Sequence, residues 1–148
     1  MYIRTKYNGE VEVDANQLFH FDKGIPAFEE EKEFALISLE EGTPFFVLQS
    51  IKTADVAFIC VDPFPYVHNY KVKLPDSLID SLQIAKEEDV AIFVFLTIQE
   101  PFHETTANLQ APLILNTVTK QGKQFMMSDS TYRTKQPIFQ QPAMKGDR

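Results

Sequence analysis

The stretch Val90-Ala91-Ile92-Phe93-Val94-Phe95-Leu96-Thr97-Ile98 is the longest apolar run of the chain, and only Thr97 interrupts it. It is rich in β-branched and aromatic residues, which favour a pleated strand. It is also far shorter than the roughly 20 apolar residues that a helix needs to cross a bilayer. We therefore predict a strand over residues 90–98 and no transmembrane helix.

Eight further runs have a similar composition and are bounded by Gly, Pro, Asn or Asp, so we predict that they are strands as well. Asn8-Gly9, between the first two runs, predicts a hairpin with a type I′ turn, because both central positions of that turn need positive φ. Gln121-Gly122 marks a second hairpin. The eight runs are residues 2–7, 10–14, 34–39, 45–49, 56–62, 70–74, 113–119 and 124–128.

One segment, residues 75–84, has helical rather than strand periodicity, with Leu78, Ile79 and Leu82 on one face and Pro75 and Asp76 suited to a helix start. Many short strands with one helix indicate a mainly β protein, a small antiparallel β-barrel-like single domain with one short α-helix. Closure of a barrel removes the exposed strand edges that invite aggregation. We expect this domain over residues 1–139 and a flexible C-terminal tail over residues 140–148.

The charge of the 148-residue chain is distributed unevenly. Residues 1–116 carry 19 acidic and 8 basic side chains, whereas residues 117–148 carry 2 acidic and 6 basic ones. An acidic body repels phosphate backbones and attracts a basic partner, although acids also keep a small domain soluble. Most of the 13 Phe and 5 Tyr lie in apolar runs and are expected in the core. We expect no direct binding to nucleic acid, no membrane association and a monomer when the protein is free.

Motifs for catalysis and for cofactors are missing from the sequence. The single Cys60 lies in an apolar run and is most simply a buried hydrophobe. The five glycines form no phosphate-binding loop, and no serine lies in a G-x-S-x-G elbow. The N-terminus has no signal peptide pattern. We expect a cytoplasmic protein that is not an enzyme and that binds no cofactor.

The three histidines, His20, His68 and His103, are too far apart in the sequence to form a known metal-ligand spacing, so no metal site is expected. His20 alternates with Phe19 and Phe21, which is typical of an outward-facing position on a strand.

An apolar turn followed by glutamates is the first candidate for recognition of a partner. The Gly and Pro of residues 24–28 fix a turn that can present Phe28 beside an acidic ridge. In the alternative interpretation, Phe28 packs inward and the glutamates are only solvated. The ridge consists of Glu29, Glu30, Glu31 and Glu33.

A second candidate is the segment 63–67, in which two prolines prevent sheet hydrogen bonds and can hold Phe64 and Tyr66 away from the barrel. Ordinary loop packing explains this segment equally well.

Polar residues near the C-terminal end form a third group of candidates. The amides of Asn108, Gln110 and Asn116 either stabilise turns or form a polar rim at a partner site. Tyr132, Arg133 and Lys135 can pair with carboxylates of the body or of a partner. The many carboxylates of the body favour an internal pair for Arg133.

Two segments carry a resemblance to a known family: Thr-Thr-Ala-Asn-Leu-Gln-Ala-Pro-Leu-Ile-Leu-Asn at 105–116 and Tyr-Arg-Thr-Lys-Gln-Pro-Ile at 132–138. Residues 24–29, 44–50 and 89–93 support it. Together they resemble the FliW family of flagellar assembly factors over nearly the whole chain. Ala27 departs from the pattern, since Gly is usual there and Ala adopts positive φ less readily.

The resemblance implies a small β-barrel-like fold in a cytoplasmic bacterial factor. It also implies two protein partners, flagellin and CsrA, an RNA-binding translational regulator. The factor would bind CsrA when flagellin is scarce and so relieve repression of flagellin translation, and accumulated flagellin would recapture the factor. Two alternatives remain open: an export chaperone that binds flagellin alone, and a ligand-binding β-barrel with an internal cavity lined by polar groups.

Overall fold

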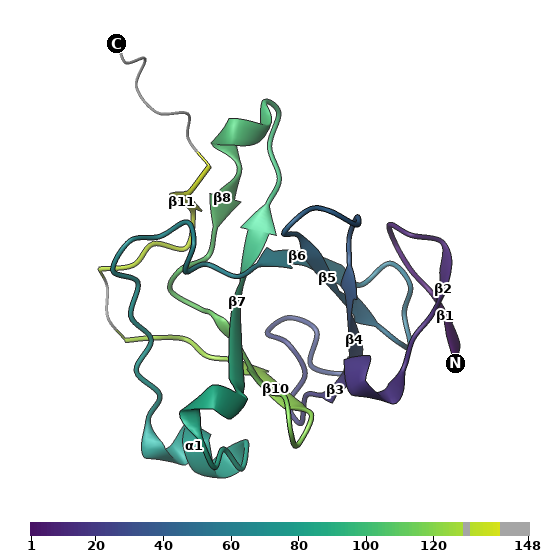
Figure 1. Cartoon of the computed structure of the whole chain (residues 1–148), viewed down its shortest axis with the longest axis horizontal. Coiled ribbons are helices and arrows are strands. Elements are labelled where there is room, and N and C mark those ends of the chain that lie inside the picture. Colours follow the sequence, from purple (N-terminus) through teal and green to yellow (C-terminus); the bar gives the residue numbers. More distant parts are fainter. Residues whose placement is uncertain (129–130, 140–148) are drawn as a thin grey trace.

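The centre of the computed structural model, which describes residues 1–128 and 131–139, is a closed barrel of seven strands (Figure 1). Six of the seven strand pairings are antiparallel, and β10 pairs with β3 in parallel at Gln121 and His20. The barrel order is β7 (Val90–Thr97), β6 (Ala57–Val61), β5 (Phe46–Ser50), β4 (Glu33–Ser38), β3 (Leu18–His20), β10 (Gln121–Gln124) and β9 (Leu113–Asn116), which pairs back onto β7. The predicted mainly β, barrel-like fold is confirmed.

Shorter elements surround the barrel. The hairpin of β1 (Tyr2–Arg4) and β2 (Glu10–Glu12) lies on one side, and α1 (Asp76–Ser81) lies on the opposite side (Figure 1). Strand β8 (Thr106–Ala107) pairs with β7, and β11 (Gln136–Pro137) pairs with β8. Among the described residues, no helix has the length and apolar character needed to cross a bilayer. The part of the chain that the structure describes also has three 3-10 turns: Ala15–Gln17, Glu87–Asp89 and Phe102–Glu104.

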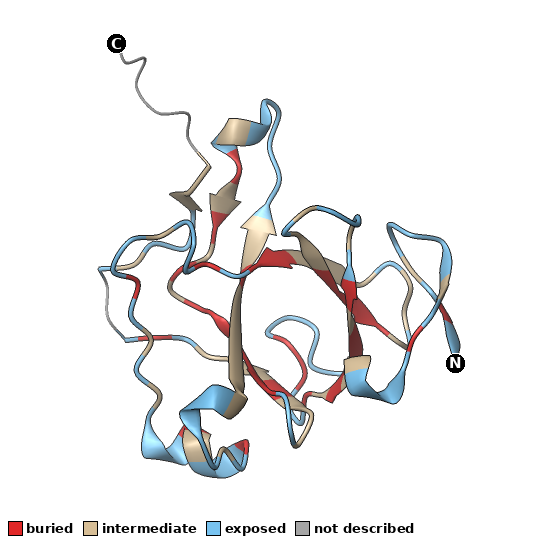
Figure 2. Ribbon diagram, in the orientation of Figure 1, coloured by how far each residue is buried: buried red, intermediate tan, exposed pale blue. Residues whose placement is uncertain are grey.

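Aromatic side chains fill the barrel interior. Phe21 and Phe34 are completely buried and pack edge to face, with ring centroids 5.2 Å apart. Phe58 of β6 stacks on Phe95 of β7 at 4.8 Å. Buried residues accordingly follow the barrel strands in Figure 2. An interior packed in this way argues against the alternative of an internal ligand site.

The outer face of the barrel is also covered, which explains why several strands are buried on both faces. Ile3 and Val13 of the hairpin region pack with Ile37 and Val47 of β4 and β5. Leu78 and Leu82, predicted on one face of the helix, pack against Ile114 of β9. Strand β9 therefore has an apolar contact on each side of its pleat, and it is buried at every position.

Several predicted boundaries are wrong. Residues 70–74 form no strand, because no other described strand pairs with them. The β1–β2 connection spans residues 5–9 and is not a two-residue type I′ turn, since Gly9 has φ 66° but Asn8 does not have positive φ. Thr5 N–H donates to the Gly9 carbonyl across it, at 2.8 Å.

The second hairpin exists, but its turn lies before Gln121-Gly122. Residues 117–120 form the turn, with Lys120 at φ 64°, and Gly122 lies within β10, which ends at Gln124. A glycine is needed there for packing rather than for turning. A Cβ on Gly122 would lie 2.6 Å from Phe21 Cζ and 2.7 Å from Leu115 Cδ2.

We predict that Gly122→Ala lowers the free energy of unfolding by about 1–3 kcal/mol, because the added methyl overpacks the barrel interior. The measurement is urea denaturation. In the double variant with Phe21→Leu, one of the two clashing groups is smaller, so the two changes should cost less together than their sum. Strict additivity would contradict the packing explanation.

Ala27 adopts the conformation that its family position suggests. Its φ is 73°, and Phe28 N–H donates to the Ile25 carbonyl at 2.6 Å, so residues 25–28 form a turn. Proline at the second position and positive φ at the third position are the pattern of a type II turn. Alanine is strained at this third position, where glycine would not be.

We predict that Ala27→Gly raises the free energy of unfolding by about 0.5–1 kcal/mol. Relief of the left-handed conformation, ~1–2 kcal/mol, exceeds the added entropy of the unfolded chain, ~0.4–1 kcal/mol. Ala15→Gly is the control, since Ala15 is exposed in a 3-10 turn without positive φ and should only lose stability. A fall in stability for Ala27→Gly would contradict the strain.

Candidate partner-binding surfaces

Phe28 is both packed and exposed, so each of its two interpretations holds in part. Its ring meets the edge of Phe58 with centroids 5.4 Å apart, while 39% of the residue remains exposed. Gly24 packs closely against the backbone of Glu29 at the base of the turn that carries Phe28. A Cβ on Gly24 would lie 2.6 Å from the Glu29 carbonyl oxygen. The Phe28 ring therefore forms an accessible end of the aromatic row that continues through Phe58 to Phe95.

Only part of the acidic ridge is available to a partner. The Glu31 carboxylate accepts hydrogen bonds from Ser50 Oγ at 2.5 Å and Thr53 Oγ1 at 2.9 Å, so it holds the β5–β6 loop. Glu29 accepts from the Ala27 N–H at 3.0 Å, and it remains exposed. Within the part of the chain that the structure describes, Glu30 is exposed and its carboxylate has no hydrogen-bond partner. Glu29 and Glu30 are thus the accessible pair.

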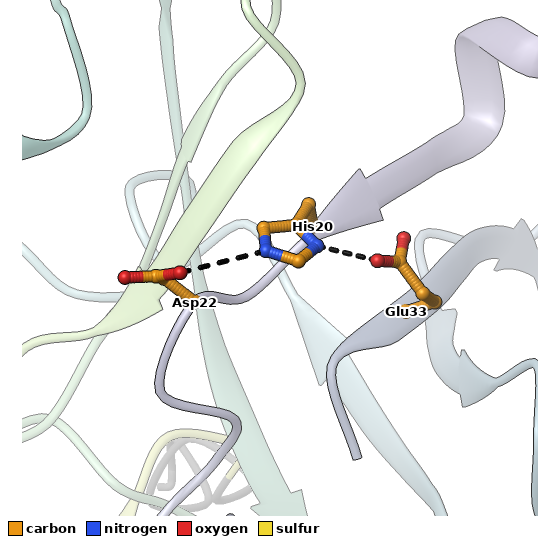
Figure 3. A network of polar contacts seen from close by, with 3 residues as sticks. All are labelled: His20, Asp22 and Glu33. Atoms are coloured by element: carbon orange, nitrogen blue, oxygen red, sulfur yellow. Dashed lines mark hydrogen bonds and ion pairs between the residues drawn. The ribbon is translucent and has the colours of Figure 1, made fainter. Parts of the chain in front are cut away.

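Glu33, the last residue of the ridge, belongs to a polar group on the barrel surface (Figure 3). His20 faces outward between two buried phenylalanines, as predicted, and its ring lies between two carboxylates. Its Nδ1 contacts Glu33 Oε2 closely, and its Nε2 lies 3.7 Å from Asp22 Oδ1. The group links β3 to β4. Within residues 1–128 and 131–139, no cluster of His, Cys, Asp and Glu is arranged to hold a metal ion.

A cleft of about 500 Å³ opens beside this group. Its lining includes Lys23 and Glu29 from the segment between β3 and β4, Leu82 from the end of α1, and Gln121 and Lys123 from β10. Sequence reasoning missed this cleft because it joins three segments that are far apart in the chain.

The loop over residues 63–67 holds its aromatic residues outward. Phe64 is 48% exposed and Tyr66 is 36% exposed, while each ring still contacts one neighbour, Tyr70 and Phe139 respectively. Phe102, which the sequence did not single out, is 42% exposed and also contacts Phe139. A signal for it existed, since Pro101 precedes Phe102 as Pro63 precedes Phe64.

The amides of the 105–116 segment stabilise local structure. Asn108 Oδ1 accepts from Ala111 N–H at 3.1 Å, and Gln110 Nε2 donates to the Met127 carbonyl at 3.4 Å. Asn116 is buried, and its amide is satisfied on both sides. Its Nδ2 donates to the Leu82 and Gln83 carbonyls, and its Oδ1 accepts from Val118 N–H and Thr119 N–H.

Tyr132 and its neighbours attach the C-terminal segment to the barrel. The Tyr132 hydroxyl accepts from Lys71 N–H at 3.0 Å, and its ring meets the edge of Tyr70 at 4.9 Å. The Tyr70 hydroxyl donates to the Leu109 carbonyl at 2.6 Å. Burial, and to a lesser extent Tyr132, raises the pKa of Tyr70 well above its usual range.

Arg133 and Lys135 are both exposed. In residues 1–128 and 131–139, no carboxylate lies within ion-pair distance of Arg133, so the internal pair favoured by the sequence is wrong. Arg133 contributes its carbonyl instead, which accepts from Leu109 N–H at 3.0 Å. The two cations are therefore available to acids of a partner.

Cys60 is completely buried, as predicted for a small hydrophobic residue. Burial raises the pKa of its thiol far above the usual range, so the reactive thiolate does not form at neutral pH. The predicted tail, residues 140–148, lies outside the described residues.

The fold and these surfaces define a small closed β-barrel with an aromatic interior, whose candidate residues lie on the outside. The model of the FliW protein family matches residues 2–138. The chain belongs to the FliW family.

Relatives with the same name cover nearly all of the chain. The flagellar assembly factor FliW of Geobacillus sp. strain WCH70 is 43% identical over 98% of this chain and 100% of its own length. That of Bacillus subtilis strain 168 is also 43% identical, over 93% of this chain and 96% of its own. A crystal structure of the flagellar assembly factor FliW has a TM-score of 0.85 and 42% identity, and it covers 94% of this chain and 97% of that one.

We predict that Asn116→Asp lowers the free energy of unfolding by at least ~2 kcal/mol. A carboxylate oxygen would replace Nδ2 and face the Leu82 and Gln83 carbonyls without a proton to donate. Asn108→Asp is the matched control, because only the Oδ1 of Asn108 accepts a hydrogen bond among the described contacts. Equal stability of the two variants in urea denaturation would contradict the role assigned to Asn116.

Proposed function

We propose that this chain is a cytoplasmic flagellar assembly factor that binds CsrA and flagellin as alternative partners. Binding to CsrA would relieve repression of flagellin translation, and binding to flagellin would end that effect. Membership of the FliW family over residues 2–138 carries the proposal. The switch needs binding at two coupled sites and no catalysis.

The charge of the barrel supports CsrA as a partner. An RNA-binding protein carries a basic surface, and residues 1–116 of this chain contain 19 acidic against 8 basic side chains. Phe28, with Glu29 and Glu30 beside it, combines an exposed ring with two accessible carboxylates. We assign the CsrA contact to these three residues. Glu31 and Glu33 contribute charge but already have partners within the chain.

The remaining candidates are proposed as parts of the partner surface without assignment to CsrA or flagellin. Phe64 and Tyr66 offer exposed rings, and Arg133 and Lys135 offer cations that have no ion-pair partner within residues 1–128 and 131–139. Asn108, Gln110 and Tyr132 are included as well, and each also has a hydrogen bond within the chain.

Calorimetry with purified CsrA, repeated after saturation with flagellin, tests the proposed switch. Binding to CsrA that flagellin abolishes is the expected result. Binding to flagellin with no heat of binding to CsrA would instead leave an export chaperone for flagellin alone. No binding to either protein would overturn the proposal.

We predict that Glu29→Gln with Glu30→Gln slows association with CsrA by about two- to fivefold at low salt and flattens the salt dependence of the rate. Glutamine retains an oxygen that can accept from the Ala27 N–H, so the turn should persist. The readout is the association rate in stopped-flow mixing.

The control removes the same charge elsewhere, through Glu40→Gln with Glu41→Gln, since both of these residues are exposed in the loop after β4. It should change the rate much less. An unchanged association rate in the Glu29 and Glu30 variant would exclude this pair from the CsrA contact.

A further inference from the structure

A groove of about 820 Å³ lies beside the first half of β7, outside the barrel interior. One wall is the extended segment before α1, and another wall is formed by α1 and the residues that follow it. Its apolar lining includes Phe64, Val72, Leu74, Ile79, Ile84 and Ile92.

The strand edge that lines this groove has no neighbouring strand among the described residues. Residues Val90 to Phe93 pair with β9 on one side. On the other side, β6 pairs only with Val94 and Phe95, because it ends at Val61. The first half of β7 is therefore paired on one edge and open on the edge that faces the groove.

The hydrogen bonds around β7 indicate which backbone groups point to the open edge. Thr117 N–H donates to the Asp89 carbonyl at 2.8 Å, and Asn108 N–H donates to the Phe95 carbonyl at 2.9 Å. The backbone N–H and C=O groups of residues 89, 91, 93 and 95 thus point towards β8 and β9, because successive residues of an antiparallel strand direct their backbone groups to opposite edges. The backbone groups of Val90 and Ile92 point to the opposite edge, which faces the groove.

Val90 N–H is already used, since it donates to the Glu87 carbonyl at the end of a 3-10 turn. The Val90 carbonyl and both backbone groups of Ile92 remain for an added strand. Such a row of open donors and acceptors is the template that strand addition uses.

The charge of the groove differs from that of the acidic body. Lys73 and Lys86 line it, and Lys71 lies on the same extended segment. No carboxylate in residues 1–128 and 131–139 forms an ion pair with any of these three lysines. Asp62 and Glu87 also line the groove, so the lysines favour carboxylates placed close to them rather than a uniformly acidic ligand.

We propose that the open edge of β7 binds an extended segment of a partner protein as an added strand. The segment would carry apolar side chains at alternate positions for the groove lining, and carboxylates that reach Lys73 and Lys86. Its backbone would bond to Ile92 and to the Val90 carbonyl. The inference rests on the proposed function and assigns this site to flagellin, because a basic RNA-binding partner is directed to the acidic ridge.

Blocking the groove is the first test. Ala85 is exposed and lines the groove, so Ala85→Trp should fill it without disturbing the core. The affinity for monomeric flagellin is expected to fall at least tenfold, with the affinity for CsrA unchanged. Ala15→Trp is the matched control, because Ala15 is equally exposed and lies in the 3-10 turn before β3. Equal affinity of both variants for flagellin would overturn the proposal.

Amide hydrogen exchange is the second test, and it needs no substitution. In the free protein, Ile92 N–H should exchange faster than the N–H groups of Ala91 and Phe93, which point to β9. Added monomeric flagellin should slow exchange at Ile92 at least tenfold. Binding of flagellin without protection of Ile92 would overturn this inference and leave the proposed function intact. Absence of flagellin binding in calorimetry would overturn both.

Discussion

The pairing of β9 with β7 closes the barrel, and the rest of the structure depends on it. Four residue pairs from Val90 with Asn116 to Phe93 with Leu113 bring the two ends of the sheet together. Asn116 stabilises this closure, since its amide binds the end of α1 on one side and the β9–β10 turn on the other. A barrel closed in this way leaves few unpaired strand edges, and each edge that remains is a candidate site for pairing with another chain.

Closure also leaves the outside of the barrel as the place where a partner can be contacted. Apolar side chains fill the interior, and rings from β3, β4, β6 and β7 lie there. Recognition must therefore use surface loops and strand edges. The Phe28 turn, the aromatic loop over residues 63–67 and the β7 groove are three such places, and each exposes apolar atoms.

The distribution of charge differs between these places. Accessible acids lie beside Phe28, whereas the lysines along the β7 groove have no ion-pair partner among the described residues. The ridge is acidic, whereas the groove carries both lysines and carboxylates, and electrostatic differences of this kind act mainly on selectivity and on the rate of encounter. Coupling between the two proposed partners would need only that occupancy of one surface disfavours occupancy of the other.

The sequence by itself determined the β class, the barrel, the single helix and the burial of Cys60, because composition and periodicity are local properties that packing preserves. The outward position of His20 followed from the same alternation. Only the tertiary structure decided that residues 70–74 stay unpaired, that Gly122 belongs to a strand, and that Glu31 and Glu33 are engaged while Arg133 is not. Hydrogen bonds and ion pairs join residues distant in the chain, so their partners are chosen when the strands come together.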